Sequence, residues 1–245
     1  MPDFGSWCSD FFVNQRISLT LDLPEAREPT LDLFDRLRRD QPRLGIVRRR
    51  DEEVALESVH DVRDFLWVAL RRTSIRSGHL NPLSTDDGYR LHRAVLATAP
   101  WYLSLSPIDI ESIDLTFGFD IETEGSRDTT VCDALLAASP LSMLIDPLQE
   151  SAIDVQPFIG IALTPGGELQ ASFEVKTRPG ARGDREPTGP GTISVYVTVR
   201  RQGPLDSLDE LPTIFATLCG HAERLCEQRA IPHLVVPIRQ ATGMC

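Results

Sequence analysis

The sequence is short of cysteine, of targeting signals and of long apolar segments, and each shortage excludes a class of protein. Its five cysteines are scattered without a CxxC pair, which indicates reduced thiols rather than a disulfide framework. The longest uncharged run, Ala94–Ile108, contains two prolines and is shorter than the roughly 20 apolar residues of a membrane-spanning helix. The first twelve residues include Asp3 and Asp10 but no basic residue, so they do not form a secretory signal. We therefore expect a soluble cytoplasmic protein with no membrane partner.

No short catalytic or nucleotide-binding motif occurs in the chain. The sequence has no GxxxxGK[ST] phosphate loop, no GxGxxG after a strand, no GxSxG nucleophile elbow and no HExxH zinc motif. These absences exclude the familiar motif-bearing enzymes, whereas an active site without a local signature stays open. The sequence therefore favours a non-enzymatic protein without excluding an enzyme, and it indicates no cofactor.

The charge is acidic overall and unevenly divided. The net charge is −11 at pH 7, and residues 1–100 hold 15 basic and 16 acidic residues, whereas residues 101–245 hold 10 basic and 20 acidic residues. Such a field repels a phosphate backbone, so we expect no nucleic-acid partner. Every basic residue except Lys176 is arginine, which binds carboxylates and phosphates through two hydrogen bonds at once. A small anionic ligand therefore stays open.

The spacing of apolar residues predicts an α+β fold. With 41% apolar residues the chain can form a sizeable core. In the first half, the pattern predicts strands at 16–23, 44–50, 53–58, 65–77 and 101–106, and helices at 29–40 and 86–98. In the second half, it predicts strands at 112–119, 158–164, 168–176, 192–201 and 232–237, and helices at 129–138 and 207–228. We expect a mainly antiparallel sheet with helices packed on one face.

The two halves share the same expected order of elements, β-α-β-β-β-α-β. The segment Leu66–Arg72, LWVALRR, aligns with Val195–Arg201, VYVTVRR, and both end in two arginines. We interpret the match as an internal duplication, with an N-terminal α+β repeat at 1–107 and a C-terminal α+β repeat at 108–245 that together form one continuous unit. Chance similarity between two apolar strands is the alternative.

The two arginine pairs form the candidate functional site. If the matched strands are neighbours across a pseudo-twofold axis, Arg71, Arg72, Arg200 and Arg201 could converge on one carboxylate or phosphate between the repeats. His79, in a polar loop after the first pair, could assist. The alternative, which we favour, is that these arginines solvate strand ends and pair with nearby acids.

Three further groups of residues invite a functional interpretation, and none supports a metal site or a catalytic base. The acidic segment 120–131 has carboxylates at calcium-loop spacing, but Val131 stands where a bidentate carboxylate is required. Cys219 and Cys226 fall on one edge of a helix and His221 on the opposite edge, so one ion could not reach all three. His92 lies on the apolar side of a helix, which is typical of a core histidine.

The sequence leaves two functions open. The first, which we favour, is a non-enzymatic binding or scaffold protein that contacts a protein partner or a second copy of itself through a sheet face, a strand edge or the loop 177–192. That loop has four glycines and three prolines in 16 residues, which is typical of an exposed connection. The second is a small-molecule enzyme or ligand-binding protein with the arginine-lined anion site described above.

Overall fold

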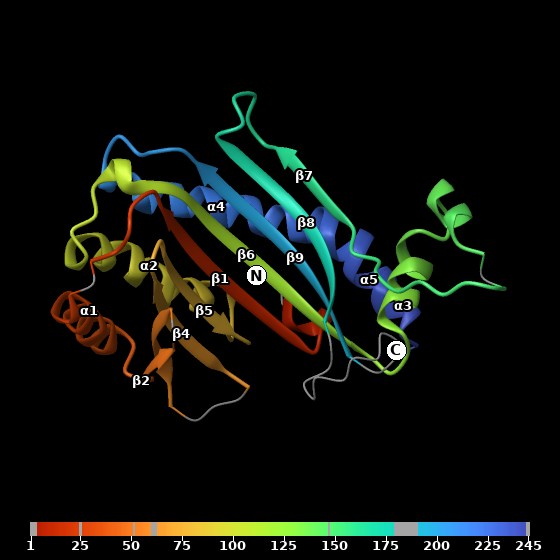
Figure 1. The fold of residues 1–245 in the computed structure, drawn as a ribbon, viewed down its shortest axis with the longest axis horizontal. Coiled ribbons are helices and arrows are strands. Elements are labelled where there is room, and N and C mark those ends of the chain that lie inside the picture. Colours follow the sequence, from red (N-terminus) through yellow and green to blue (C-terminus); the bar gives the residue numbers. More distant parts are fainter. Residues whose placement is uncertain are drawn as a thin grey trace.

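A computed structural model describes residues 4–24, 26–50, 52–59, 63–146, 148–178 and 191–243. In these residues nine antiparallel strands form one sheet in the order β2-β3-β4-β5-β1-β6-β9-β8-β7 (Figure 1). The predicted α+β class, with a mainly antiparallel sheet, is confirmed. No helix in the described ranges is long and apolar enough to cross a membrane.

The first half supplies five strands and two helices. In chain order these are β1 (Asp10–Leu19), α1 (Arg27–Asp40), β2 (Leu44–Arg50), β3 (Glu53–Ser58), β4 (Phe65–Arg71), β5 (Ser74–Leu80) and α2 (Thr85–Tyr102), preceded by the 3-10 turn η1 (Phe4–Trp7). The start of α2 follows from its sequence. The Ser84 hydroxyl accepts a hydrogen bond from the Asp87 backbone N–H, and two aspartates in the first turn complement the positive end of the helix dipole.

The second half supplies four strands and a chain of helices. In order these are η2 (Pro107–Asp109), β6 (Ile110–Thr123), α3 (Arg127–Leu135), η3 (Pro140–Leu144), β7 (Phe158–Ala162), β8 (Leu169–Arg178), β9 (Gly191–Gln202), η4 (Leu208–Glu210), α4 (Leu211–Leu225), the π-helical η5 (Cys226–Val235) and α5 (Val236–Ala241). Ser207 and Glu210 form a capping box at the start of η4, ahead of the main helix. Because α4 begins only at Leu211, Pro212 falls in its first turn, where proline is tolerated.

The helices cover one face of the sheet. α2 packs on β5 and β1, α4 packs on β9 and β6, and Figure 1 shows both helices behind the strands. The strand side chains that face them are buried and mostly apolar, such as Val13, Ile17, Leu115, Phe117 and Val197. This covered face holds the hydrophobic core, so the opposite face of the sheet is left for other contacts.

Two strand boundaries differ from the predictions. β1 begins at Asp10 rather than Arg16 and ends at Leu19, so Leu21 is 65% exposed instead of buried in the predicted strand. The single strand predicted at 65–77 is a hairpin, because β4 and β5 pair with each other through a two-residue turn at Arg72–Thr73. That turn contains no glycine or asparagine, the residues by which such turns are usually recognised.

The two predicted closing strands are wrong. Residues 101–106 finish α2 and its following turn, and residues 232–237 belong to η5 and α5. In both places the prediction treated a proline as incompatible with the interior of a helix. Pro100 lies buried inside α2, and Pro232 lies in a stretch of wider π-helical turns, which relieve the clash between a proline ring and the carbonyl of the preceding turn.

The internal duplication is not confirmed, and the division at residue 107 stays a prediction. The two aligned strands, β4 and β9, do not occupy equivalent positions in the sheet. β9 borders the central strand β6, whereas β5 borders the central strand β1. β4, which carries Leu66–Arg71, is one strand further out. Most of the loop 177–192, residues 179–190, lies outside the described residues.

Candidate functional site

The face of the sheet opposite the helices, which we call the open face, is hollowed and polar. One hollow of about 830 Å³ lies over β1, β6, β9, β8 and β7, and a second of about 530 Å³ lies over β2 to β5. No residue of a described helix lines either hollow. Trp67 and Arg76 line both, so they stand where the two hollows meet.

A row of charged residues crosses the open face. Strand register places Arg76 of β5, Arg16 of β1, Asp114 of β6 and Arg200 of β9 next to one another in that order. The Arg200 guanidinium donates two hydrogen bonds of 2.6 Å to the Asp114 carboxylate, which is nearly buried. The hydrogen bonds with Asp114 raise the pKa of Arg200. The row therefore contains one satisfied ion pair and two further arginines.

Three of the four predicted arginines pair with separate acids, Arg200 with Asp114 as described above. Arg71 binds Glu53 at 2.7 Å and Arg72 binds Asp22 at 2.8 Å. Arg201 donates to the backbone carbonyl of Gln202. These contacts agree with the favoured alternative, in which arginines at strand ends pair with nearby acids.

The structure does not bring the five predicted residues together. Arg71 and Arg200 both point to the open face, but four strand spacings separate β4 from β9, about 19 Å. Arg72 lies in the β4–β5 turn. His79 and Arg201 share strand parity with the buried core residues and point to the covered face. Binding of an anion by these five residues stays a proposal.

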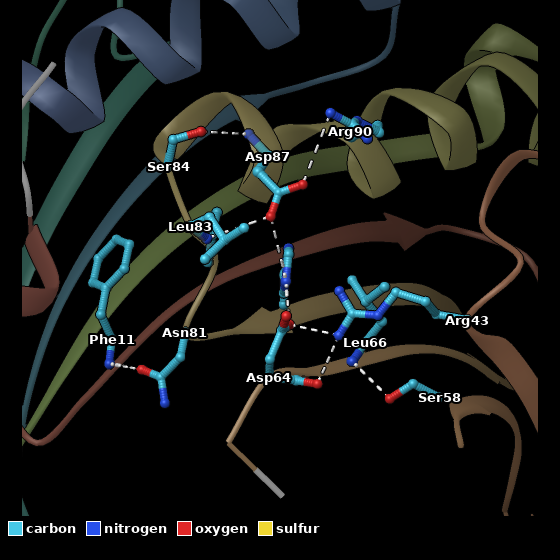
Figure 2. A network of polar contacts seen from close by, with 12 residues as sticks. Phe11, Arg43, Ser58, Asp64, Leu66, Asn81, Leu83, Ser84, Asp87 and Arg90 are labelled. Carbon is cyan, nitrogen blue, oxygen red and sulfur yellow. Dashed lines mark hydrogen bonds and ion pairs between the residues drawn. The ribbon is translucent and has the colours of Figure 1, made fainter. Parts of the chain in front are cut away.

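His79 instead belongs to a buried polar network, of which Figure 2 shows Arg43, Asp64 and Asp87. Its Nε2 lies 2.8 Å from Asp64 Oδ1 and 3.9 Å from Asp87 Oδ2, and Arg43 forms an ion pair of 2.7 Å with Asp64. Burial opposes ionisation of Asp64, but hydrogen bonds from Arg43 and His79 outweigh it and lower the pKa of this carboxyl. The network holds β4, β5 and α2 together.

A second buried network lies on the same face and contains His92. Its Nδ1 is 2.7 Å from the Ser77 hydroxyl, and its Nε2 is 3.1 Å from the Val13 carbonyl oxygen. Burial lowers the pKa of His92 to about 3, so the ring is neutral at ordinary pH. Because both Ser77 and His92 are fully buried, this pair is a core contact.

A third hollow, of about 670 Å³, lies between α2 and α4 on the outer side of the helix layer. Aromatic and aliphatic residues such as Trp101 and Phe215 line it. Its polar groups are paired, since Tyr89 Oη donates to Glu223 at 2.8 Å and Arg93 binds Asp86 at 2.7 Å. Burial raises the pKa of the nearby Cys219 thiol to about 12, which makes it a poor nucleophile. Three acids, Asp86, Asp209 and Glu223, and one arginine, Arg93, line this hollow, so an anionic ligand is not expected there.

The described residues contain no group of three or more His, Cys, Asp or Glu side chains placed to hold a metal ion. Four of the cysteines, Cys8, Cys132, Cys219 and Cys226, are free thiols. The fifth, Cys245, lies outside the described residues.

The two edges of the sheet differ in charge. The β2 edge ends in Arg48, Arg49 and Arg50, whereas β7 has the sequence FIGIA and no charged residue. In β7, Phe158 is 63% exposed and Ile159 is 58% exposed. Charged residues protect a sheet edge from pairing with another strand, and β7 lacks this protection.

Sequence reasoning missed Arg16, Arg76 and Trp67, the residues that distinguish the open face. Arg16 and Arg76 are polar residues within expected strands, and Trp67 alternates with apolar residues of an expected strand. No other local feature of the sequence distinguished these three residues. Their proximity depends on the pairing of β1 with β5 and of β5 with β4.

No family model and no curated protein matches the sequence. Two solved structures show a likeness over nearly the whole chain. DynU16, a protein of the dynemicin biosynthetic locus, is 15% identical over 95% of this chain and 98% of its own, with a TM-score of 0.26. BexL, a di-domain ARO/CYC protein from the BE-7585A biosynthetic pathway, is 11% identical over 96% and 99%, with a TM-score of 0.22. TM-scores of this size support no argument about fold or function.

Proposed function

We propose that the protein is a non-enzymatic binding protein that takes up an extended segment of a partner polypeptide along β7. The observation that carries the proposal is the uncharged edge strand Phe158–Ala162, whose first two side chains are exposed. A strand added to such an edge gains main-chain hydrogen bonds, and alternate side chains supply specificity.

The hydrogen-bond pattern of β7 shows which of its backbone N–H and C=O groups do not bond to β8 and could bond to an added strand. Val175 N–H donates to the Pro157 carbonyl and Leu163 N–H donates to the Leu169 carbonyl, so the odd-numbered residues of β7 bond to β8. Residues that bond to the neighbouring strand alternate in an antiparallel pair. The N–H and C=O groups of Phe158, Gly160 and Ala162 therefore point away from the sheet.

The chemistry of the partner segment follows from this edge. Phe158 and Gly160 also line the large hollow, so a strand beside β7 would place alternate side chains at its rim. Since β7 offers apolar side chains and no charge, the segment that fits it is extended and has apolar residues at alternate positions.

Gly160→Pro tests the proposal. Proline at 160 removes an outward N–H and costs no hydrogen bond to β8, so the fold should survive. Selection from a displayed library of random linear peptides should enrich alternating apolar sequences on the wild type. Gly160→Pro should lose their binding.

Val47→Pro is the matched control at the other edge. In the β2–β3 hairpin Arg50 pairs with Glu53 across a two-residue turn, so the N–H of Val47 also points outward. This variant should bind the selected peptides as the wild type does. Equal binding by all three proteins would show that β7 is not the docking edge.

The alternative function, binding of a small anionic ligand, is favoured by a different observation. Three arginines, Arg16, Arg76 and Arg200, and two acids line the hollow of about 830 Å³, although the whole chain is acidic. A hollow of this size can hold a small ligand. This alternative does not require the β7 edge.

A further inference from the structure

Two arginines face each other directly on the open face. Arg16 of β1 and Arg76 of β5 are Cα partners. Hydrogen bonds from Asn81 N–H to the Phe11 carbonyl and from Leu19 N–H to the Thr73 carbonyl show that odd-numbered residues of these strands form the hydrogen-bonded pairs. Arg16 and Arg76 are therefore a non-hydrogen-bonded pair, the geometry in which opposite side chains approach most closely. Like charges in that position destabilise a sheet.

The acids nearby form their ion pairs with other arginines. Asp114, on the other side of Arg16, is held by two hydrogen bonds from Arg200. Glu53 is held by Arg71 at 2.7 Å. No ion pair within the described residues includes Arg16 or Arg76.

The Arg76 guanidinium also has an unused donor. Its Nε is buried and has no hydrogen-bond partner in the described part of the chain. Burial, with the neighbouring charges of Arg71 and Arg16, lowers the pKa of Arg76. A buried donor without an acceptor is unfavourable, and a bound oxygen would satisfy it.

Trp67 and two hydroxyls complete the surroundings. Trp67 lies beside Gly78, its Cα partner in β5, and a Cβ at residue 78 would collide with the indole ring and with Asn14. Glycine is thus required for the ring to lie against the sheet. On the other side, the hydroxyls of Thr116 and Thr198 are 2.8 Å apart on the floor of the hollow.

We propose that Arg16 and Arg76 bind the oxyanion of a small organic ligand, a carboxylate or a phosphate, whose planar body lies against Trp67. Two guanidinium groups offer hydrogen bonds that match either oxyanion. The hollow of about 830 Å³ has the size of a small-molecule site. The ligand neutralises a like-charge pair that the folded chain leaves uncompensated.

Calorimetric titration at constant ionic strength tests the proposal with four probes: benzoate, phenyl phosphate, acetate and inorganic phosphate. We expect saturable binding of at least one aromatic probe, tighter than its non-aromatic counterpart, and the comparison of benzoate with phenyl phosphate identifies the oxyanion. Arg16→Gln and Arg76→Gln should each weaken binding about tenfold, as loss of a charged hydrogen bond does. Trp67→Leu should remove the advantage of the aromatic probe.

Arg49→Gln is the matched control, because it removes the same charge from a side chain on the opposite face of the edge strand β2. Its affinity for the probes should stay at the wild-type value. A second readout concerns the free protein: Arg16→Gln should raise its melting temperature, since a repulsion is removed. No saturable binding by any probe, equal weakening by Arg49→Gln, or a lower melting temperature in Arg16→Gln would overturn the proposal.

Discussion

The two faces of the sheet differ in the pairing of two prominent sets of residues, a histidine and a carboxylate on one face and two arginines on the other. On the covered face, His92 has a partner at each ring nitrogen, and the Asp64 carboxylate is held by Arg43 and His79. On the open face, Arg16 and Arg76 stand opposite each other, and neither forms an ion pair within the part of the chain that the structure describes. The same strands carry both arrangements, because successive side chains point to opposite faces.

This difference separates residues that hold the fold from residues that are available for binding. An unpaired polar group in the core costs free energy, and His92 and Asp64 avoid this cost through partners within the chain, whereas His79 Nδ1 and Gln15 Nε2 have no hydrogen-bond partner among the described residues. Two like charges opposite each other beside a hollow do not stabilise the fold and instead reduce its stability. Stability should therefore depend on the covered face and ligand affinity on the open face, and substitutions at adjacent strand residues can test this division.

The largest effect is expected for Phe117→Ala on β6. Phe117 is fully buried on the covered face and its ring packs against Phe4, Phe11 and Tyr89. Removing a buried aromatic ring should lower the free energy of unfolding by about 3–5 kcal/mol. Thr116→Ala, the neighbouring open-face residue, loses one hydroxyl hydrogen bond and should cost about 1 kcal/mol. Urea unfolding of both variants measures the contrast, and equal losses would contradict it.

The second effect is a pH dependence that comes from the covered face. The pKa of His92 falls from 6.5 to about 3 on folding, so the unfolded chain binds this proton more readily. The stabilisation is complete above pH 6.5 and is lost as the pH falls toward 3, at about 1.4 kcal/mol per pH unit. His92→Gln should reduce the slope of unfolding free energy against pH between 6.5 and 5 by that amount.

The control for this prediction is Val95→Ala, which removes buried side-chain atoms from the same helix but no titratable group. Its pH slope should match that of the wild type, even if its overall stability differs. If His92→Gln kept the wild-type slope, the neutral core role of His92 would be wrong.

The sequence predicted those parts of the fold that depend on local chemistry. The strands predicted at 44–50, 53–58, 158–164 and 168–176 correspond to β2, β3, β7 and β8, and the helix predicted at 86–98 lies within α2. Prolines 100 and 232 were misread because their tolerance depends on packing and on a widened helical turn. The β4–β5 turn was missed because Arg72–Thr73 carries no turn signal.

The candidate site was less predictable than the fold for a physical reason. Arg71-Arg72 and Arg200-Arg201 were conspicuous as sequence pairs, yet adjacent strand residues point to opposite faces and cannot act together. Arg16 and Arg76 are 60 positions apart and meet only through strand register. Periodicity identifies the face on which a side chain lies, but not the residue opposite it.

The smallest effect in stability, and the sharpest test of the division between faces, is expected for Asp114→Asn. Asp114 is the acid on the open face that Arg200 binds through two hydrogen bonds. Loss of this charged pair, whose arginine is partly solvated, should lower the unfolding free energy by about 1 kcal/mol. The same change removes a negative charge beside Arg16 and releases Arg200, so affinity for benzoate or phenyl phosphate should rise while stability falls.

The control is Asp22→Asn, which disrupts the exposed pair with Arg72 at the β4–β5 turn. It should change neither the unfolding free energy nor the anion affinity measurably. If anion affinity fell in Asp114→Asn, the intact Asp114–Arg200 pair would support the binding site. Hydrogen-bonded pairs would then organise the open face as they do the covered face.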